Sequence, residues 1–267
     1  MHRPSERVVS EGAAVKRALI ITGGGRGIGA AIARHAARQG YPTALLYRAD
    51  SASAEAVCVE ARAMGIPSVA IQADVADEAD ILRAFKSAQA ELGPLGGLVN
   101  NAGINAGHMQ INEFDRERLE RVFRVNVIGT MLCTREAVRH MGLSHGGQGG
   151  IIVNISSMAA SIGGRPGSSH YAASKAAVDT FTVGAARELA KERIRVYAIR
   201  PGATETDWTS EGFRDPQTRG AIERSIAMGR YAKPDEIAVP VMALFSESFA
   251  FLSGAVIDAS GGGYVIA

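Results

Sequence analysis

The pattern that most constrains the fold of this chain is a series of short apolar runs, separated by longer segments with helical spacing and many alanines. Strands buried on both faces of a parallel sheet read as continuous apolar runs rather than alternating ones. Strands that alternate with helices indicate such a sheet, and right-handed crossovers then make it doubly wound. We expect about seven strands, at residues 17–22, 43–48, 68–74, 97–101, 150–156, 194–200 and 255–258.

The chain is expected to form a single α/β domain with helices on both faces of the sheet. Its 267 residues are enough for one large domain, and no linker or repeat divides them. Residues 1–16 are polar without a clear period, which predicts a flexible N-terminal extension and a domain over residues 17–267. Residues 202–232 are irregular and follow the sixth strand, where open α/β sheets bind ligands. This stretch is either a mobile substrate lid or an ordinary surface excursion.

Composition argues against several classes of partner. The formal net charge of +2 is too small to favour nucleic acid. No apolar stretch reaches the roughly 18 residues that cross a membrane, and the N-terminus lacks the apolar core of a secretory signal. The six histidines show no metal-ligand spacing, so no metal is expected. Cys58 and Cys133 fall in segments with helical spacing and are expected to be small buried residues, which fits a reducing cytoplasm.

A glycine-rich turn at residues 22–29 follows the first apolar run and precedes an alanine-rich helical segment. Glycines let backbone N–H groups approach a pyrophosphate, and a helix N-terminus adds partial positive charge. The spacing Gly-x-x-x-Gly-x-Gly differs from the usual G-x-G-x-x-G, but its place between a strand and a helix favours a dinucleotide site in a Rossmann-type sheet. The turn residues expected to bind the dinucleotide are Gly23, Gly25, Arg26, Gly27, Ile28 and Gly29.

The end of the second strand indicates which dinucleotide binds. An acidic residue there would bind the ribose hydroxyls of NAD. Here the strand ends with Tyr47 and Arg48, whereas Asp50 falls in the following loop. Arg26 and Arg48 can hold a 2′-phosphate through charge-assisted hydrogen bonds, which favours NADP(H). The alternative is that both arginines are solvated surface residues and that the cofactor is NAD.

Other strand ends supply further candidates for the cofactor site. An aspartate after a strand, here Asp74, either caps the next helix or contacts the adenine. Two successive asparagines at 100–101 suggest hydrogen bonds that fix the backbone beside the cofactor. The remaining candidates are Val75, Asn101, Ala102, Gly103, Pro201, Gly202, Thr204 and Thr206.

A second group of motifs lies in the middle of the chain. Tyr171 and Lys175 are four residues apart in a helical segment, so their side chains share one face. The apolar run upstream ends in two hydroxyls, Ser156 and Ser157, and Asn126 lies in a helical stretch before that run. Each motif alone is common, and only the set is specific.

Taken together, the motifs resemble the short-chain dehydrogenase/reductase family from about residue 18 to residue 265. They occur in the family's order: the Thr-Gly-x-x-x-Gly-x-Gly turn, Asn-Asn-Ala-Gly, the asparagine, the serine, Tyr-x-x-x-Lys and Pro-Gly. The resemblance extends to bacterial members labelled glucose 1-dehydrogenase-like or 3-oxoacyl-carrier-protein reductase-like. It implies a catalytic tetrad of Asn126, Ser157, Tyr171 and Lys175, with Tyr171 and Lys175 also touching the cofactor.

The serine is the one ambiguous member of this tetrad. The family often places it thirteen residues before the tyrosine, which is Met158 here. Ser157 and Ser156 lie one and two residues further upstream. A one-residue insertion in the glycine-rich stretch 163–169 reconciles the spacing, and Ser157 is favoured because the family's serine is the one that leaves the strand.

The resemblance implies hydride transfer between NADP(H) and a small-molecule carbonyl or alcohol, with Tyr171 as general acid or base. A free tyrosine titrates near ~10, and a nearby lysine ammonium lowers that pKa. Ser157 is expected to stabilise the forming oxyanion. Lys175 would hold the nicotinamide ribose, Asn126 a water that resupplies protons, and Thr206 the carboxamide.

Two other function classes compete with this expectation: a non-catalytic NADP(H)-binding regulatory protein, and an enzyme that uses the same cofactor for epimerisation or dehydration. An NAD-dependent alcohol or sugar dehydrogenase is the nearer alternative. The presence of both the tyrosine and the lysine favours an active oxidoreductase.

Several features remain open between a functional and an ordinary structural role. The resemblance implies a homotetramer, and the apolar stretches 172–183 and 249–266 are buried either between subunits or within one chain. His170 either lines the pocket or, as we expect, lies on the surface. Trp208 and Phe213 either cover the substrate or pack within the lid.

Overall fold

The structure, a computed structural model, describes residues 16–207 and 215–263 of the chain. Almost all of the expected N-terminal extension, residues 1–15, lies outside the described residues, as do Trp208 and Phe213. Within the described residues, no helix combines the length and the apolar character needed to cross a membrane.

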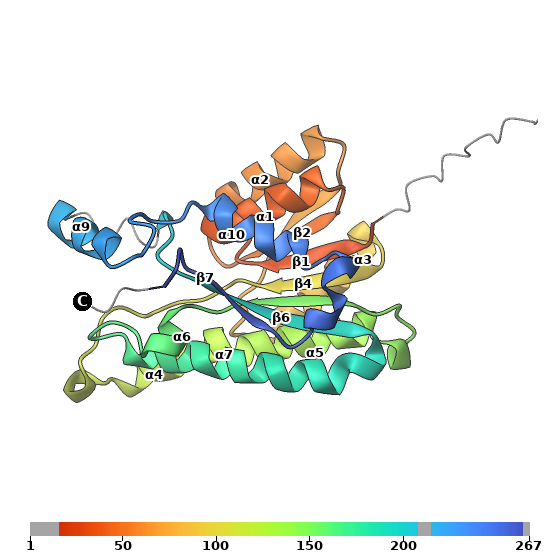
Figure 1. The fold of residues 1–267 in the computed structure, drawn as a ribbon. Helices are drawn as coiled ribbons and strands as arrows, with labels where there is room; N and C mark the ends of the chain where they lie inside the picture. Colours follow the sequence, from red (N-terminus) through yellow and green to blue (C-terminus); the bar gives the residue numbers. More distant parts are fainter. Residues whose placement is uncertain (1–15, 208–214, 264–267) are drawn as a thin grey trace, which may run out of the picture.

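Seven parallel strands form a single sheet in the order β3-β2-β1-β4-β5-β6-β7 (Figure 1). The predicted fold class, a doubly wound parallel sheet of about seven strands, is therefore confirmed. The strand order reverses between β1 and β4, which is where a sheet of this kind opens a crevice at the carboxyl ends of its strands. The strands are β1 (Ala18–Thr22), β2 (Thr43–Tyr47), β3 (Ser68–Gln72), β4 (Leu95–Asn100), β5 (Gly150–Ile155), β6 (Ile194–Pro201) and β7 (Val256–Ala259).

Helices cover both faces of the sheet, in two layers visible in Figure 1. Helices α1, α2 and α10 contribute to one apolar core, and α3, α5 and α7 to the other. The α-helices are α1 (Gly27–Arg38), α2 (Ser51–Ala63), α3 (Glu78–Leu92), α4 (Arg116–Phe123), α5 (Thr130–Met141), α6 (Ala159–Ile162), α7 (Ser169–Glu188), α9 (Pro216–Arg224) and α10 (Pro234–Ala243). Short 3₁₀ turns are η1 (Ile111–Glu113), η3 (Leu143–His145), η4 (Leu189–Glu192) and η5 (Glu247–Leu252), and η2 (Arg124–Gly129) is a π-helix.

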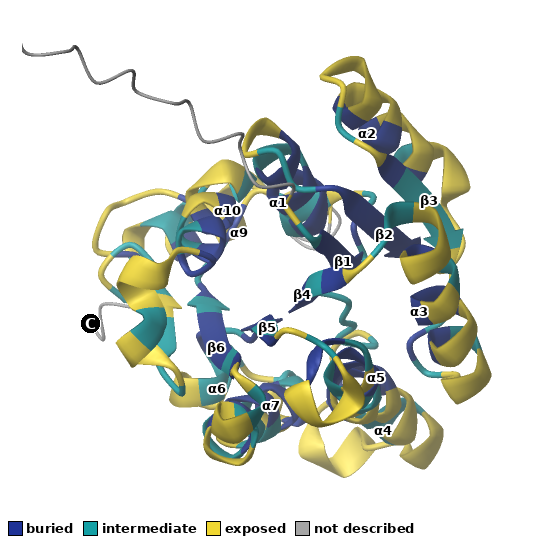
Figure 2. Ribbon diagram, turned by 90° about the vertical axis from the view of Figure 1, so that its right-hand side faces the viewer, coloured by how far each residue is buried: buried dark blue, intermediate teal, exposed yellow. Residues whose placement is uncertain are grey.

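The strands in the middle of the sheet are buried because helices cover both of its faces. Every residue of β1 is buried, as a strand packed on both faces requires (Figure 2). Cys58 and Cys133 are free and buried in α2 and α5, as expected. The boundaries differ from the prediction mainly at β3, which ends at Gln72, and at β4, which begins at Leu95 because Ala18 pairs with that residue before a register shift.

The stretch predicted as a substrate lid begins after β6. Thr204 and Ala232 form an isolated bridge across its base, and α9 lies within it. Residues 208–214 of this stretch lie outside the described residues. Its role as a lid stays a prediction.

Candidate functional site

In the glycine turn between β1 and α1, Gly29 is too close to neighbouring backbone to accept a side chain. A Cβ atom on Gly29 would lie 2.2 Å from the carbonyl oxygen of Gly23. Gly23 itself has a φ of +64°, in the left-handed region that favours glycine. The turn therefore brings bare backbone to the carboxyl end of β1, at the crevice.

The N-terminus of α1 is left without an acidic cap. Asp50, Asp77, Asp115 and Asp215 each accept backbone N–H groups at the start of α2, α3, α4 and α9. Arg26, at the same position of α1, forms no side-chain cap hydrogen bond, and the first turn of α1 contains no acidic residue. A helix start of this kind, beside a bare glycine turn, fits the phosphates of a dinucleotide.

The end of β2 presents a cation instead of a carboxylate. Tyr47 is its last residue, and Arg48 is exposed just beyond it. Asp50 caps α2, where it accepts the Ser53 backbone N–H at 3.0 Å and the Ser53 hydroxyl at 2.6 Å. These hydrogen bonds from Ser53 hold the pKa of Asp50 below its usual range, and Arg26 adds a smaller contribution. Asp50 therefore lies in the loop after β2, as the sequence predicted, and its carboxylate is used to cap α2.

The residues after β3 differ in part from the expectation. Asp74 was a candidate cap for the next helix, but α3 begins at Glu78 and its cap is Asp77. The cap interpretation is therefore wrong, because the helix starts one turn later. Asp74 instead accepts the backbone N–H of Ala76 at 2.9 Å. Val75 is buried in the core below it.

Asn101 links the ends of β4 and β1. Its amide nitrogen donates to the carbonyl oxygens of Thr22 and Gly23, both at 3.0 Å. The Thr22 hydroxyl in turn accepts the backbone N–H groups of Asn101 and Ala102 at 3.0 and 2.9 Å. The expected backbone-fixing hydrogen bonds are thus present for Asn101, and they brace the glycine turn. Asn100 instead donates to the side chains of Thr134 and Asn154, so the expectation is wrong for that residue.

Tyr171 and Lys175 lie on α7, as their spacing predicted. The Lys175 Nζ atom lies 5.9 Å from the centroid of the Tyr171 ring and donates to the carbonyl oxygen of Ile155, at the end of β5, at 2.8 Å. Burial lowers the pKa of Lys175 to about 8, while the Asp179 carboxylate acts in the opposite direction. The lysine is therefore still mainly an ammonium at neutral pH.

Asn126 lies in the π-helix η2, which interrupts the helical stretch between α4 and α5. Its side-chain nitrogen donates to the Ile104 carbonyl at 2.8 Å and to Ser174 Oγ at 2.9 Å, and its oxygen accepts the Ile104 N–H at 2.8 Å. A Cβ atom on Gly103 would lie 3.4 Å from both Asn126 Oδ1 and Lys175 Nζ. The structure thus brings Asn126, Gly103 and Lys175 together, and π-turns of this kind often occur at functional sites.

The two serines after β5 have different surroundings. Ser156 is 3% exposed and its hydroxyl donates to the Lys175 carbonyl at 3.2 Å. Ser157 is half-buried and its oxygen accepts the Ala159 N–H at 3.1 Å. Met158 is buried. Ser157 is therefore the better placed of the two hydroxyls to reach a substrate.

A match to the short chain dehydrogenase family covers residues 17–217. The chain belongs to this family. It is 37% identical over 243 residues to the uncharacterized oxidoreductase YgfF of Escherichia coli (strain K12), covering 91% of this chain and 98% of that protein.

Two solved structures support the membership. A short chain dehydrogenase from Burkholderia cenocepacia J2315 in complex with NADP shares 33% identity and a TM-score of 0.85, over 93% of this chain and 98% of that one. A 3-ketoacyl-(acyl-carrier-protein) reductase from Brucella melitensis complexed with NADH shares 33% identity and a TM-score of 0.85, over 93% and 99%. The predicted likeness to such reductases is confirmed, and the likeness to glucose 1-dehydrogenase-like members stays a prediction.

One residue of this short-chain dehydrogenase is placed against expectation. His170 was expected on the surface, but it is 3% exposed. Its Nε2 atom lies 2.8 Å from the Asn105 carbonyl oxygen, which only accepts, so this nitrogen carries the hydrogen. Phe114 packs against its ring. The surface interpretation is wrong because the loop after β4, far away in the sequence, folds over the start of α7.

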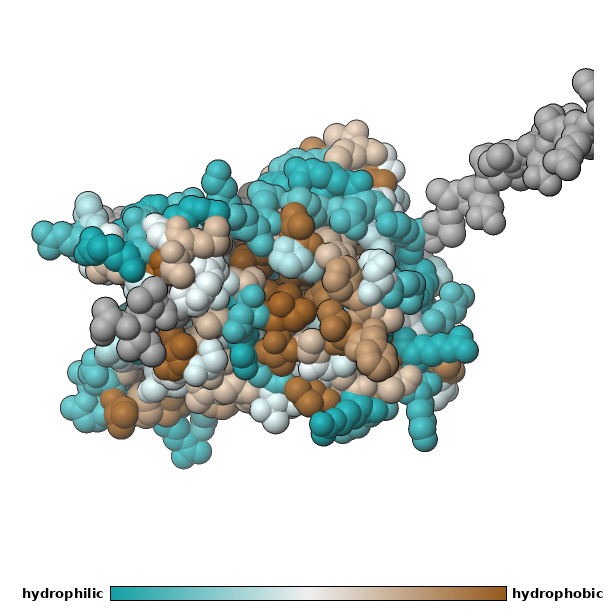
Figure 3. Space-filling view, viewed as in Figure 1, coloured by the Kyte–Doolittle hydropathy of each residue, from teal (hydrophilic) through white to brown (hydrophobic). Residues whose placement is uncertain are grey.

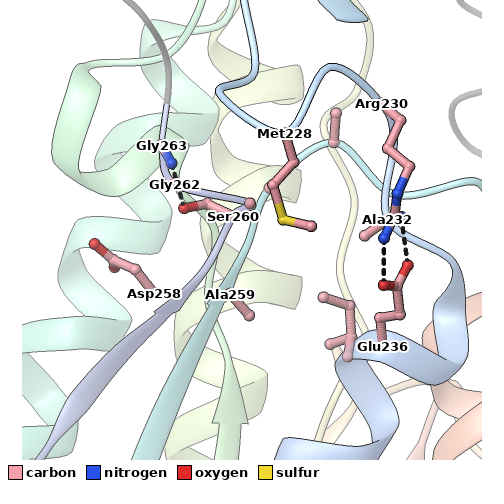
Figure 4. Close-up of a pocket in the computed structure, with 13 residues that line it drawn as sticks. Met228, Arg230, Ala232, Glu236, Asp258, Ala259, Ser260, Gly262 and Gly263 are labelled. Carbon is pink, nitrogen blue, oxygen red and sulfur yellow. Dashed lines mark hydrogen bonds and ion pairs between the residues drawn. The ribbon is translucent and has the colours of Figure 1, made fainter.

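Beyond β6, the structure places the predicted cofactor residues in two pockets. One, of about 320 Å³, is lined by Gly27 and Thr206, so Thr206 reaches the glycine turn. The other, of about 450 Å³, is lined by Gly202 and the segment after β7 (Figure 4). Sequence reasoning missed that segment, although the glycine run 261–263 after the last strand was a signal. Pro201 and Thr204 are buried beside these pockets.

No group of three or more His, Cys, Asp or Glu side chains in the described parts of the chain is placed to hold a metal ion.

Proposed function

We propose that this member of the family is an NADP(H)-dependent oxidoreductase that transfers a hydride between the nicotinamide and a carbonyl or secondary alcohol. The observation that carries the proposal is the buried Lys175 ammonium beside the Tyr171 ring, at the end of β5. Titration of the purified protein with NADPH and with NADH, followed by nicotinamide fluorescence, tests the cofactor. A screen of ketones and aldehydes with NADPH tests the reaction, and no turnover with any of them would favour the regulatory-protein alternative.

The residues of the site divide the chemistry among them. NADPH, when bound, supplies the hydride. In the reducing direction Tyr171 donates its proton to the substrate oxygen, and Ser157 donates a hydrogen bond to the same atom. The Lys175 ammonium favours the tyrosinate that remains. Asn126 positions the loop after β4 next to Lys175, where a water could resupply the proton.

The choice of cofactor rests on Arg26 and Arg48. Both are exposed, one at the start of α1 and one just after β2, and Asp50, the carboxylate that follows Arg48, caps α2. The solved relatives hold NADP in one case and NADH in the other, so an NAD-dependent dehydrogenase is the second candidate. The two guanidinium groups favour the 2′-phosphate of NADP(H).

Arg48→Asp should move the preference toward NAD. The change removes a cation from the 2′-phosphate and adds an acid that can bind ribose hydroxyls, so the kcat/KM ratio of NADPH to NADH should fall by about 10-fold or more. Steady-state kinetics with both cofactors measure it. Lys191→Asp makes the same change of charge in η4, before β6, and should leave the ratio unaltered. An unaltered ratio in Arg48→Asp would mean that the 2′-phosphate is held elsewhere.

Ser157→Ala and Ser156→Ala should separate the two serines. Loss of the Ser157 donor should lower kcat by about 10²-fold, as for other oxyanion donors. Loss of the Ser156 hydroxyl removes a buried hydrogen bond and should lower the free energy of unfolding by about 1 kcal/mol, with kcat changed far less. Steady-state kinetics and chemical denaturation of both variants distinguish the two roles. A large loss of kcat in Ser156→Ala, with kcat little changed in Ser157→Ala, would assign the catalytic role to Ser156.

We also propose a homotetramer in the cytoplasm that acts on a small molecule rather than on nucleic acid or membrane. Exposed apolar side chains support the assembly: Ile128 in η2, Met131 in α5, Val239 in α10, and Phe249 and Phe251 in η5. Figure 3 shows hydrophobic side chains gathered on the face where β7 forms the sheet edge. Burial of such a face favours association. Light scattering of the purified protein gives the mass of the assembly.

A further inference from the structure

A third residue continues the spacing of Tyr171 and Lys175 along α7. Asp179 follows Lys175 by four residues, so all three side chains lie on neighbouring turns of one helix face. The site described above uses the first two. Asp179 is not part of the Tyr-x-x-x-Lys motif.

Asp179 is buried and only half satisfied. The residue is 6% exposed. Its Oδ2 atom accepts from Arg200 Nε at 2.8 Å, whereas Oδ1 is buried with no hydrogen-bond partner among the described residues. A buried carboxylate with one oxygen that accepts no hydrogen bond is uncommon, because its burial costs free energy. Such a group therefore calls for a functional explanation.

Arg200 holds this carboxylate in place from the sheet. It lies near the end of β6, and its Nη1 atom also contacts Asp258 on the neighbouring strand β7 at 3.4 Å. The Asp258 side chain is 49% exposed, so this second ion pair faces water. Arg200 thus fixes the Asp179 carboxylate from the sheet side of α7, whereas solvent screens the charge of Asp258.

Lys175 supplies the other half of the argument. It is 4% exposed, and its ammonium needs a compensating charge in that setting. Burial lowers its pKa, and the charge that opposes this shift is the Asp179 carboxylate. The elements packed around this face add Arg200 from β6, Asp258 from β7 and the neutral amide of Asn126 from η2.

We propose that Asp179 is a positioning residue of the site: oriented by Arg200, its carboxylate keeps Lys175 charged one helical turn away. The inference deepens the proposed function, on which it rests. It makes the acid–base site a line of three groups, in which Asp179 acts on Tyr171 only through Lys175.

The chain allows a direct measurement, because it contains five lysines and only Lys175 is buried among those in the described residues. The protein labelled with ¹³C at lysine Cε is titrated by NMR from pH 6 to 11, and Lys175→Met assigns the Lys175 signal. In Asp179→Asn the Lys175 signal should titrate about one pH unit lower than in the wild type, because a favourable charge is lost. Asp179→Glu should restore the wild-type value.

Two further variants separate a charge effect from a structural one. Arg200→Gln removes a cation beside the carboxylate, so Lys175 should titrate at a higher pH than in the wild type, the opposite direction to Asp179→Asn. Asp258→Asn removes the solvent-facing partner and should leave the titration unmoved. A structural role alone predicts shifts of the same sign in both arginine and aspartate variants. If Asp179→Asn does not fold, the sign of the Arg200→Gln shift still decides.

The pH profile of carbonyl reduction links the coupling to the reaction. The rate should fall at high pH as Lys175 loses its proton, and in Asp179→Asn this fall should begin about one unit lower. An unmoved Lys175 titration in Asp179→Asn, or a lowered one in Arg200→Gln, overturns the inference. Absence of reduction by the wild type would instead contradict the proposed function, and the NMR result would stand apart from it.

Discussion

Tyr171→Phe should lower kcat/KM for carbonyl reduction by about 10³-fold or more, the upper range for loss of a general acid. The phenylalanine ring keeps the shape and the packing beside Lys175, and the variant loses the phenolic hydroxyl with its transferable proton. NADPH affinity, measured by nicotinamide fluorescence, should stay within a few-fold of the wild type. The two measurements together separate a chemical defect from a folding or binding defect.

Tyr41→Phe is the matched control for this variant. Tyr41 packs against Phe245 with its ring centroid 5.9 Å away, outside the site described above. Loss of its hydroxyl should leave kcat/KM within about two-fold, because this half-buried side chain lies outside the site. More than a tenth of wild-type activity in Tyr171→Phe would rule out Tyr171 as the proton donor.

The parts of the structure that were predictable from sequence depend on local or repeated patterns. Short apolar runs that alternate with helical segments favour the strands of a parallel sheet, and all seven predicted strands are present. A spacing of four places Tyr171 and Lys175 on one face of any helix. The run of glycines predicts the tight turn, because the backbone there must lie close to the end of β4. Asn101 holds that backbone by donating to the carbonyl oxygen of Thr22.

Other features depend on contacts between segments that are far apart in the sequence. His170 is buried by the loop that carries Asn105, which no local pattern records. Two aspartates precede α3, and which one caps it depends on where the helix begins. The π-helix around Asn126 has no periodic signal, because its wider turn is stabilised by the side-chain hydrogen bonds to Ile104. The role proposed for Asp179 depends on its ion pair with Arg200, which lies on another element, β6.

Gly29→Ala should abolish tight cofactor binding, although alanine is the better helix former. In an unconstrained helix the exchange stabilises by about 1 kcal/mol. Here the new Cβ atom would lie 2.2 Å from the Gly23 carbonyl oxygen and 2.6 Å from Asn101 Nδ2, so the turn must open. We expect a loss of about 2 kcal/mol in the free energy of unfolding, typical of overpacking, and at least about 10-fold weaker NADPH binding because the backbone moves away from the pyrophosphate.

Gly184→Ala provides the contrast, because it makes the same exchange within a helix where the added atom meets nothing within 4 Å. That variant, in α7, should gain about 0.5–1 kcal/mol in the free energy of unfolding and bind NADPH as the wild type does. Chemical denaturation and NADPH titration of both proteins give the comparison. Wild-type NADPH affinity together with the expected loss of stability in Gly29→Ala would mean that the dinucleotide binds away from the glycine turn. If Gly29→Ala and Gly184→Ala lowered the free energy of unfolding equally, the short distance between Gly29 and Gly23 would not be the reason that the turn needs glycine.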